Sequence, residues 1–143
     1  MGYRATTLAA VTVLGCSSPA GPPPGVSVTA VLSASAVGVG EALTVQVTIT
    51  NASANEYLVP GSAGRCIGFV DVRDSRGHSV LYGNPRICDA AAAVHPLAPF
   101  GALSDRLPIA GLAAGHYHVR AGIGLREHGQ IWSAFQGLSV RAP

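Results

Sequence analysis

Lysine is absent from this chain, and charge of either sign is scarce. Only 11% of the residues are charged, against about 25% in an average globular protein. All nine basic residues are arginine, and they are scattered along the chain. The sequence therefore lacks the clustered basic patch that nucleic-acid binding requires. Because 48% of the residues are apolar, we expect a folded globular domain rather than a disordered chain.

Sequence signatures of catalysis are also missing. The chain contains no G-x-S-x-G, no H-E-x-x-H and no glycine-rich phosphate loop ahead of a helix. We therefore expect a protein without enzyme activity and without a cofactor. The alternative is a catalytic triad assembled only in space, which would leave no such signature.

The apolar run near the start of the chain is too short to cross a membrane. It covers residues 8–14, between Arg4 and Ser17, whereas a transmembrane helix needs about 20 apolar residues. A basic start, a short apolar run and a small residue before the cleavage point are typical of a secretory signal. The alternative interpretation is a buried strand followed by an ordinary thiol at Cys16.

The sequence Val13-Leu14-Gly15-Cys16 resembles the lipobox of bacterial lipoproteins. The resemblance implies that residues 1–15 are a signal peptide and that Cys16 carries several acyl chains. Two or more chains anchor a protein stably, whereas one chain binds only marginally. We therefore expect an exported protein, anchored to a membrane of the cell envelope on its periplasmic or extracellular face.

Residues 16–25 are rich in proline and glycine. Proline-rich segments adopt an extended conformation of about 3.1 Å per residue, so this segment is predicted to be a semi-rigid tether of about 25 Å. The domain is predicted to span residues 26–143. It contains Cys66 and Cys88, which an oxidising compartment favours as a disulfide. Two free buried thiols or a redox pair are the alternatives, although the spacing is not C-x-x-C.

Apolar and polar residues alternate with a period of two through most of the domain. Such alternation, rich in β-branched residues, marks strands with one buried face. The segments that show it are 26–33, 43–50, 67–73, 78–82, 103–109, 112–125 and 131–140. A single helical turn is expected at Ala90–Ala93, and a slip of phase is expected at Gln136 and Gly137.

About seven short strands separated by turn signals predict an all-β, antiparallel β-sandwich. Tyr117, at the start of the penultimate strand, resembles the tyrosine corner of immunoglobulin-like domains, in which the phenol bonds to nearby main chain. An ordinary core aromatic is the alternative for Tyr117. Trp132 and Phe135 are expected in the core rather than in a binding patch, because the chain has few aromatic residues.

Three motifs carry a family resemblance: residues 49–53, 69–77 and 112–119. In this order they are similar to the immunoglobulin-like domains of bacterial lipoproteins and of the BsuPI-type intracellular proteinase inhibitor family, over residues 28–140. The resemblance implies an immunoglobulin-like sandwich and, for the BsuPI-type family, inhibition of proteinases. The chain departs from the family at Ala114, within the usual proline-glycine-x-tyrosine motif, and in its cysteine pair.

His116 and His118 are the best candidates for metal ligands. On a strand both imidazoles leave the same face, with their Cα atoms about 7 Å apart, and imidazole suits copper and zinc. A third ligand would have to come from His78, His95 or His128. The alternative is that both histidines are simply solvated on an outer sheet face.

The function that we expect is therefore binding of another envelope protein by a non-catalytic immunoglobulin-like module. Such sandwiches offer loops and edge strands to partners, and residues 82–102 are long enough for such a role. Metal binding by His116 and His118 and proteinase inhibition are the alternative functions.

Overall fold

Eleven strands and no helix make up residues 21–143, the part of the chain that the computed structural model describes. The predicted signal peptide and the lipidation site Cys16 lie outside the described residues. In chain order the strands are β1 (Val26–Leu32), β2 (Ala36–Gly38), β3 (Leu43–Asn51), β4 (Tyr57–Ser62), β5 (Gly68–Asp74), β6 (Ser79–Gly83), β7 (Ala92–Leu97), β8 (Ala102–Ile109), β9 (Gly115–Leu125), β10 (Gly129–Trp132) and β11 (Gln136–Arg141).

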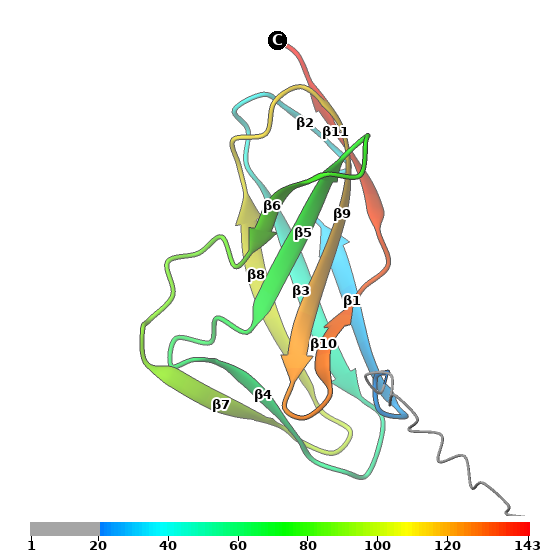
Figure 1. Ribbon diagram of the computed structural model, residues 1–143, viewed down its shortest axis with the longest axis vertical. Helices are drawn as coiled ribbons and strands as arrows, with labels where there is room; N and C mark the ends of the chain where they lie inside the picture. The colour runs from blue at the N-terminus through cyan, green and yellow to red at the C-terminus, as the bar shows by residue number, and fades with distance from the viewer. Residues whose placement is uncertain (1–20) are drawn as a thin grey trace, which may run out of the picture.

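The strands form a sandwich of two sheets with an additional ribbon (Figure 1). The first sheet has the order β1-β3-β8, and the second has the order β2-β11-β9-β5-β6, with β10 also paired to β9. The ribbon consists of β4 and β7. Of the described pairings, β2 with β11 is parallel and the others are antiparallel. The predicted all-β sandwich is thus confirmed, with eleven strands in place of about seven.

The core lies between the two sheets, where the period-two pattern placed it. Strands β3 and β9 are the central strands of their sheets, and each buries every second residue over most of its length. The inward side chains of β9 are the ones that the alternation indicated: Tyr117, Val119, Ala121, Ile123 and Leu125.

No helix in residues 21–143 is long and apolar enough to cross a membrane.

Three of the strands, β2, β4 and β7, are missing from the sequence prediction. In the β4–β7 ribbon, Leu58 stands opposite Pro96 and Pro60 stands opposite Val94. Proline lacks a ladder N–H and is therefore confined to edge strands, and both strands of a ribbon are edges. The helical turn predicted at Ala90–Ala93 is wrong, because Ala92 and Ala93 pair with β4 and this pairing overrides the helix propensity of alanine.

The phase slip between β10 and β11 occurs at Ala134 and Phe135, two residues earlier than predicted. Ser133 N–H donates to the Ala121 carbonyl at 2.8 Å, and Ala121 N–H donates to Ser133 Oγ at 3.1 Å. Gln136 then pairs with Val119, so two residues of this strand stand opposite Arg120 alone. This one-residue bulge turns Phe135 outward.

Trp132 and Phe135 are therefore not core residues, and the expectation that placed them there is wrong. Trp132 is half-buried on the outer face of the six-stranded sheet, opposite Gly122. Phe135 is 42% exposed. Both rings pack against arginine side chains on that face.

Tyr117 forms the predicted tyrosine corner. Its ring is buried in the core, and its hydroxyl donates to the Ala113 carbonyl at 2.8 Å. The bond ties the start of β9 to the loop that precedes it.

We predict that Tyr117→Phe lowers the free energy of unfolding by about 1 kcal/mol, the usual net contribution of one hydrogen bond. Tyr82→Phe is the matched control, because its exposed hydroxyl donates to Gln130 Oε1; it should change stability by less than about 0.5 kcal/mol. Urea unfolding, with an unchanged slope, measures both variants. Equal losses in the two variants would contradict a structural role for the corner.

Candidate functional site

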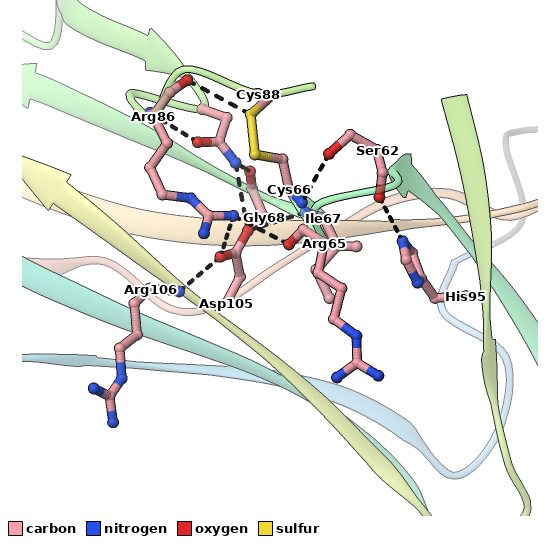
Figure 2. Close-up of polar contacts among 11 residues, drawn as sticks. Ser62, Arg65, Cys66, Ile67, Gly68, Arg86, Cys88, His95, Asp105 and Arg106 are labelled. Atoms are coloured by element: carbon pink, nitrogen blue, oxygen red, sulfur yellow. Dashed lines mark hydrogen bonds and ion pairs between the residues drawn. A yellow bond between two sulfur atoms is a disulfide. The ribbon is translucent and has the colours of Figure 1, made fainter. Parts of the chain in front are cut away.

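The loop formed by residues 84–91, between β6 and β7, is fastened to the sandwich by a disulfide (Figure 2). Cys88 in this loop is bonded to Cys66, which precedes β5, and their Cα atoms are 5.9 Å apart. The predicted bridge is therefore present. In the chain-entropy picture, a closure of this length stabilises the fold by about 3 kcal/mol.

A buried carboxylate on β8 provides a second attachment for the loop (Figure 2). The side chain of Asp105 is 2% exposed, and its Oδ1 lies 2.6 Å from Arg86 Nη2. Its Oδ2 accepts the main-chain N–H groups of Ile67 at 3.0 Å and Gly68 at 2.9 Å. One carboxylate thus joins β8 of the first sheet, the start of β5 in the second sheet and the loop.

Two further hydrogen bonds hold Arg86, one within the loop and one to the segment before β5. Its N–H donates to Asn84 Oδ1 at 2.9 Å, and its Nη2 also donates to the Arg65 carbonyl at 3.1 Å. Both neighbours of Ile87 are attached to the sandwich, Arg86 by its ion pair with Asp105 and Cys88 by its disulfide. The Ile87 side chain itself is wholly exposed, at 105%. The loop presents one apolar side chain on a fixed backbone.

Asp105 was not identified as a site residue from the sequence, although a signal for it existed. In β8, Asp105, Leu107 and Ile109 occupy alternate positions, so all three side chains point inward. A carboxylate at an inward position is buried, and a buried charge must be paired. The alternation therefore indicated an ion pair, but the distant Arg86 could not be chosen from spacing alone.

A second cluster covers the outer face of the six-stranded sheet. We call it the aromatic–arginine face, and it consists of Phe69, Arg73, Tyr82, Arg120, Trp132 and Phe135. The guanidinium carbon of Arg120 lies 4.3 Å from the ring centroid of Trp132 and 4.7 Å from that of Phe135. Arg73 lies 5.4 Å from the Phe135 centroid. Cation–π attraction of this kind favours the stacked arrangement.

The aromatic rings of the face close over a glycine. Phe69 and Trp132 pack edge to face with centroids 5.2 Å apart, and Tyr82 lies 6.0 Å from Trp132. A Cβ on Gly122 would lie 2.9 Å from atoms of both Phe69 and Trp132. Glycine at this position therefore permits the rings to meet across β9.

Asp71 lies beneath the two arginines and orients them. Its side chain is 1% exposed, and its Oδ2 lies 2.9 Å from Arg73 Nε and 3.0 Å from Arg120 Nη2. Ser79 Oγ donates to Oδ1 at 2.9 Å. Burial raises the pKa of Asp71, but the hydrogen bonds from Ser79, Arg120 and Arg73 outweigh burial, so the pKa lies below its ordinary value of 3.8.

The two candidate metal ligands share a face, as predicted, but the third ligand does not join them. His116 and His118 are both exposed on β9, and His118 packs edge-on against Phe135. The other histidines have separate neighbours: His78 approaches Asp74, His95 contacts the Ser62 carbonyl, and His128 packs on Tyr57. Within residues 21–143, no group of three His, Cys, Asp or Glu side chains could hold a metal ion.

We predict that Asp105→Ala lowers the free energy of unfolding by about 3–5 kcal/mol, because it leaves the charge of Arg86 without a carboxylate and two main-chain N–H groups without an acceptor. Arg106→Ala is the control. Arg106 is the next residue of β8 but is exposed, so its loss should cost less than about 0.5 kcal/mol. Urea unfolding of the oxidised proteins measures both, and a small effect at Asp105 would contradict its role in joining the two sheets.

Asp71 makes stability depend on acidity. Because its pKa is lower in the folded protein than in the unfolded chain, its contribution is fully present above the ordinary value of 3.8 and is lost as pH falls through the lower folded value. We expect Asp71→Asn to remove this part of the acid sensitivity. Urea unfolding between pH 2 and pH 6, on the order of the range in which carboxylates titrate, compares the two proteins. Parallel pH profiles would contradict the prediction.

Neither a family model nor a curated protein sequence matches this chain. The resemblance to the BsuPI-type family therefore stays a prediction. Similarity is found among solved structures, at low sequence identity.

One similar structure is the CARDB domain of the PF1109 protein from Pyrococcus furiosus in complex with di-metal ions, with a TM-score of 0.50 and 13% identity, covering 81% of this chain and 87% of that chain. A second is Spo0M, a sporulation control protein from Bacillus subtilis, with a TM-score of 0.50 and 10% identity, covering 83% of this chain and 50% of that chain. A third is a β-glucosidase from Erythrobacter marinus, with a TM-score of 0.51 and 11% identity, covering 81% of this chain but 15% of that chain. At these identities the likeness shows a shared β-sandwich fold and leaves function open.

Proposed function

We propose that this protein is a non-catalytic, immunoglobulin-like binding module of the bacterial cell envelope, held to the membrane by lipid on Cys16. The Cys66–Cys88 disulfide indicates an oxidising, extracytoplasmic location. The short apolar run just before Cys16 supports export and lipidation. The module binds a partner protein with its aromatic–arginine face.

The observation that carries this proposal is the composition of that face. Aromatic residues and arginine are enriched at protein interfaces, and tyrosine, tryptophan and arginine dominate binding hot spots. Tyr82 is 60% exposed, Phe135 is 42% exposed, and the neighbouring Val80 is 49% exposed. These side chains form an accessible patch on strands rather than scattered single residues.

The face is also prepared for binding. Arg120 is fixed between two rings and by Asp71, so it loses little side-chain freedom when a partner arrives. Two arginines and one aspartate leave a net charge of +1 on this cluster. A partner surface that combines apolar groups with a carboxylate would complement it.

Proteinase inhibition is the second candidate function, and the loop formed by residues 84–91 favours it. The loop holds Ile87 fully exposed between an ion pair and a disulfide, and a pre-organised loop inserts into a cleft at low entropic cost. Metal binding by His116 and His118 has no comparable support.

We predict that a photo-crosslinking phenylalanine analogue at position 82, in cells that make the full chain, forms a discrete adduct with one envelope protein. The same analogue at Val31 is the control, because this residue is 64% exposed on β1 of the other sheet. Adding Phe135→Asp should remove the adduct at position 82, since a carboxylate disrupts the stack with Arg120 and places charge in the interface.

Three outcomes of this crosslinking experiment are informative. An adduct at position 82 that survives Phe135→Asp, or equal adducts at positions 82 and 31, would reject the aromatic–arginine face. The same analogue placed at the exposed Ile87 tests the second candidate function. An adduct with a peptidase at position 87, together with no adduct at position 82, would favour proteinase inhibition. Urea unfolding of the Phe135→Asp protein separates loss of binding from loss of fold.

A further inference from the structure

An exposed aromatic residue stands at the end of the sandwich where β1 begins. Phe100, in the turn between β7 and β8, is 74% exposed. Its φ is 56°, in the left-handed region that bulky side chains rarely adopt. A strained backbone that holds an apolar ring in solvent is an arrangement that points to a function for the ring.

Hydrogen bonds fix this turn next to the start of the domain. Phe100 N–H donates to the Ser53 carbonyl at 3.2 Å, and Ala52 N–H donates to the Gly25 carbonyl at 2.8 Å. The fully buried Asn51 binds both turns, because its Nδ2 donates to the Ala98 carbonyl and its Oδ1 accepts from Ser53 N–H. Phe100 and Gly25 are therefore held on one rigid corner.

The chain before this corner is short. Pro23 is buried, and its carbonyl accepts Val26 N–H at 3.1 Å, so the last part of the predicted tether folds onto the sandwich. Pro22 follows Cys16 by six residues, a length that spans at most about 20 Å when fully extended. A lipid on Cys16 therefore keeps this end of the sandwich close to the bilayer.

We propose that Phe100 inserts into the interfacial layer of the bilayer that holds the lipid, so that the sandwich stands on the membrane at this end. The proposal rests on the lipid anchor of the proposed function. Aromatic and aliphatic side chains bury in the boundary between headgroups and acyl chains, and Phe100 supplies a second attachment beside the acylated cysteine.

The contact is apolar rather than electrostatic. The neighbouring pocket between β4 and the β9–β10 hairpin is lined by Glu56, Arg126, Glu127 and His128 among others, so acids outnumber arginine there. Such a surface gains little from anionic headgroups. We therefore expect the contact to form on zwitterionic lipid and to withstand high salt.

The test uses the full lipidated chain, reconstituted into phosphatidylcholine vesicles that contain brominated lipid as a quencher. A fluorescent amino acid replaces either Phe100 or Val39. Val39 is 48% exposed and lies beyond the other end of β3, which is about 30 Å long. We expect quenching at position 100 to exceed that at position 39 several-fold and to be unchanged in high salt.

Equal quenching at positions 100 and 39, or quenching at position 100 that salt abolishes, would overturn the proposal. Flotation with the vesicles distinguishes this failure from failure of the anchor. The wild-type chain should float and Cys16→Ser should not. If the chain floats but quenching at position 100 is not selective, the lipid anchor stands and the proposed Phe100 contact is rejected. If the wild-type chain does not float, both the anchor and the Phe100 contact are rejected.

Discussion

A single buried carboxylate connects the parts of this protein that the chain keeps far apart. Asp105 accepts two N–H groups at the start of β5 and pairs with Arg86 in the loop, so that both sheets and the loop meet at one charge. A buried charge is tolerated only when it is fully paired. Gly68 makes the approach sterically feasible, because a Cβ there would lie 2.7 Å from Val47. The disulfide then closes the same region covalently, since Cys66 is adjacent to Ile67 and Cys88 lies two residues after Arg86.

The same chemistry recurs on the outer face of the second sheet, with a different result. Asp71 is also buried and is also paired with arginine, but its partners Arg73 and Arg120 lie over aromatic rings. Lysine could not replace Arg120, because stacking on a ring while bonding a carboxylate through two nitrogens needs the planar guanidinium. Arg120 does both, with Nε and Nη2 on Asp71 and its carbon over Trp132. At Arg120, the choice of arginine over lysine therefore has a structural reason.

Much of the fold could be predicted from the alternation of apolar and polar residues, because β3 and β9 are central strands with one apolar, buried face and one more polar face. The cysteine bridge and the Tyr117 corner followed from composition and position. The β4–β7 ribbon could not be predicted, since its prolines are acceptable only because each strand has a free edge. The aromatic–arginine face was missed for another reason. Its aromatic residues come from three separate parts of the chain, namely β5, β6 and residues 132–135. The outward turn of Phe135 also depends on a bulge that Ser133 stabilises with its side chain.

The two proposed surfaces are compatible in space. Strand β1 begins and β9 ends at the same end of the sandwich, the end that carries Phe100 (Figure 1). Gly122, at the centre of the aromatic–arginine face, precedes the β9–β10 turn at Arg126 by four residues, which corresponds to about 13 Å along a strand. A sandwich that stands on this end therefore keeps the face beside the membrane but outside the headgroup layer. Confinement to one surface raises the effective concentration of two proteins anchored there. The orientation thus favours a partner that is held in the same membrane. Because the effective concentration is raised, a modest interface suffices to bind such a partner.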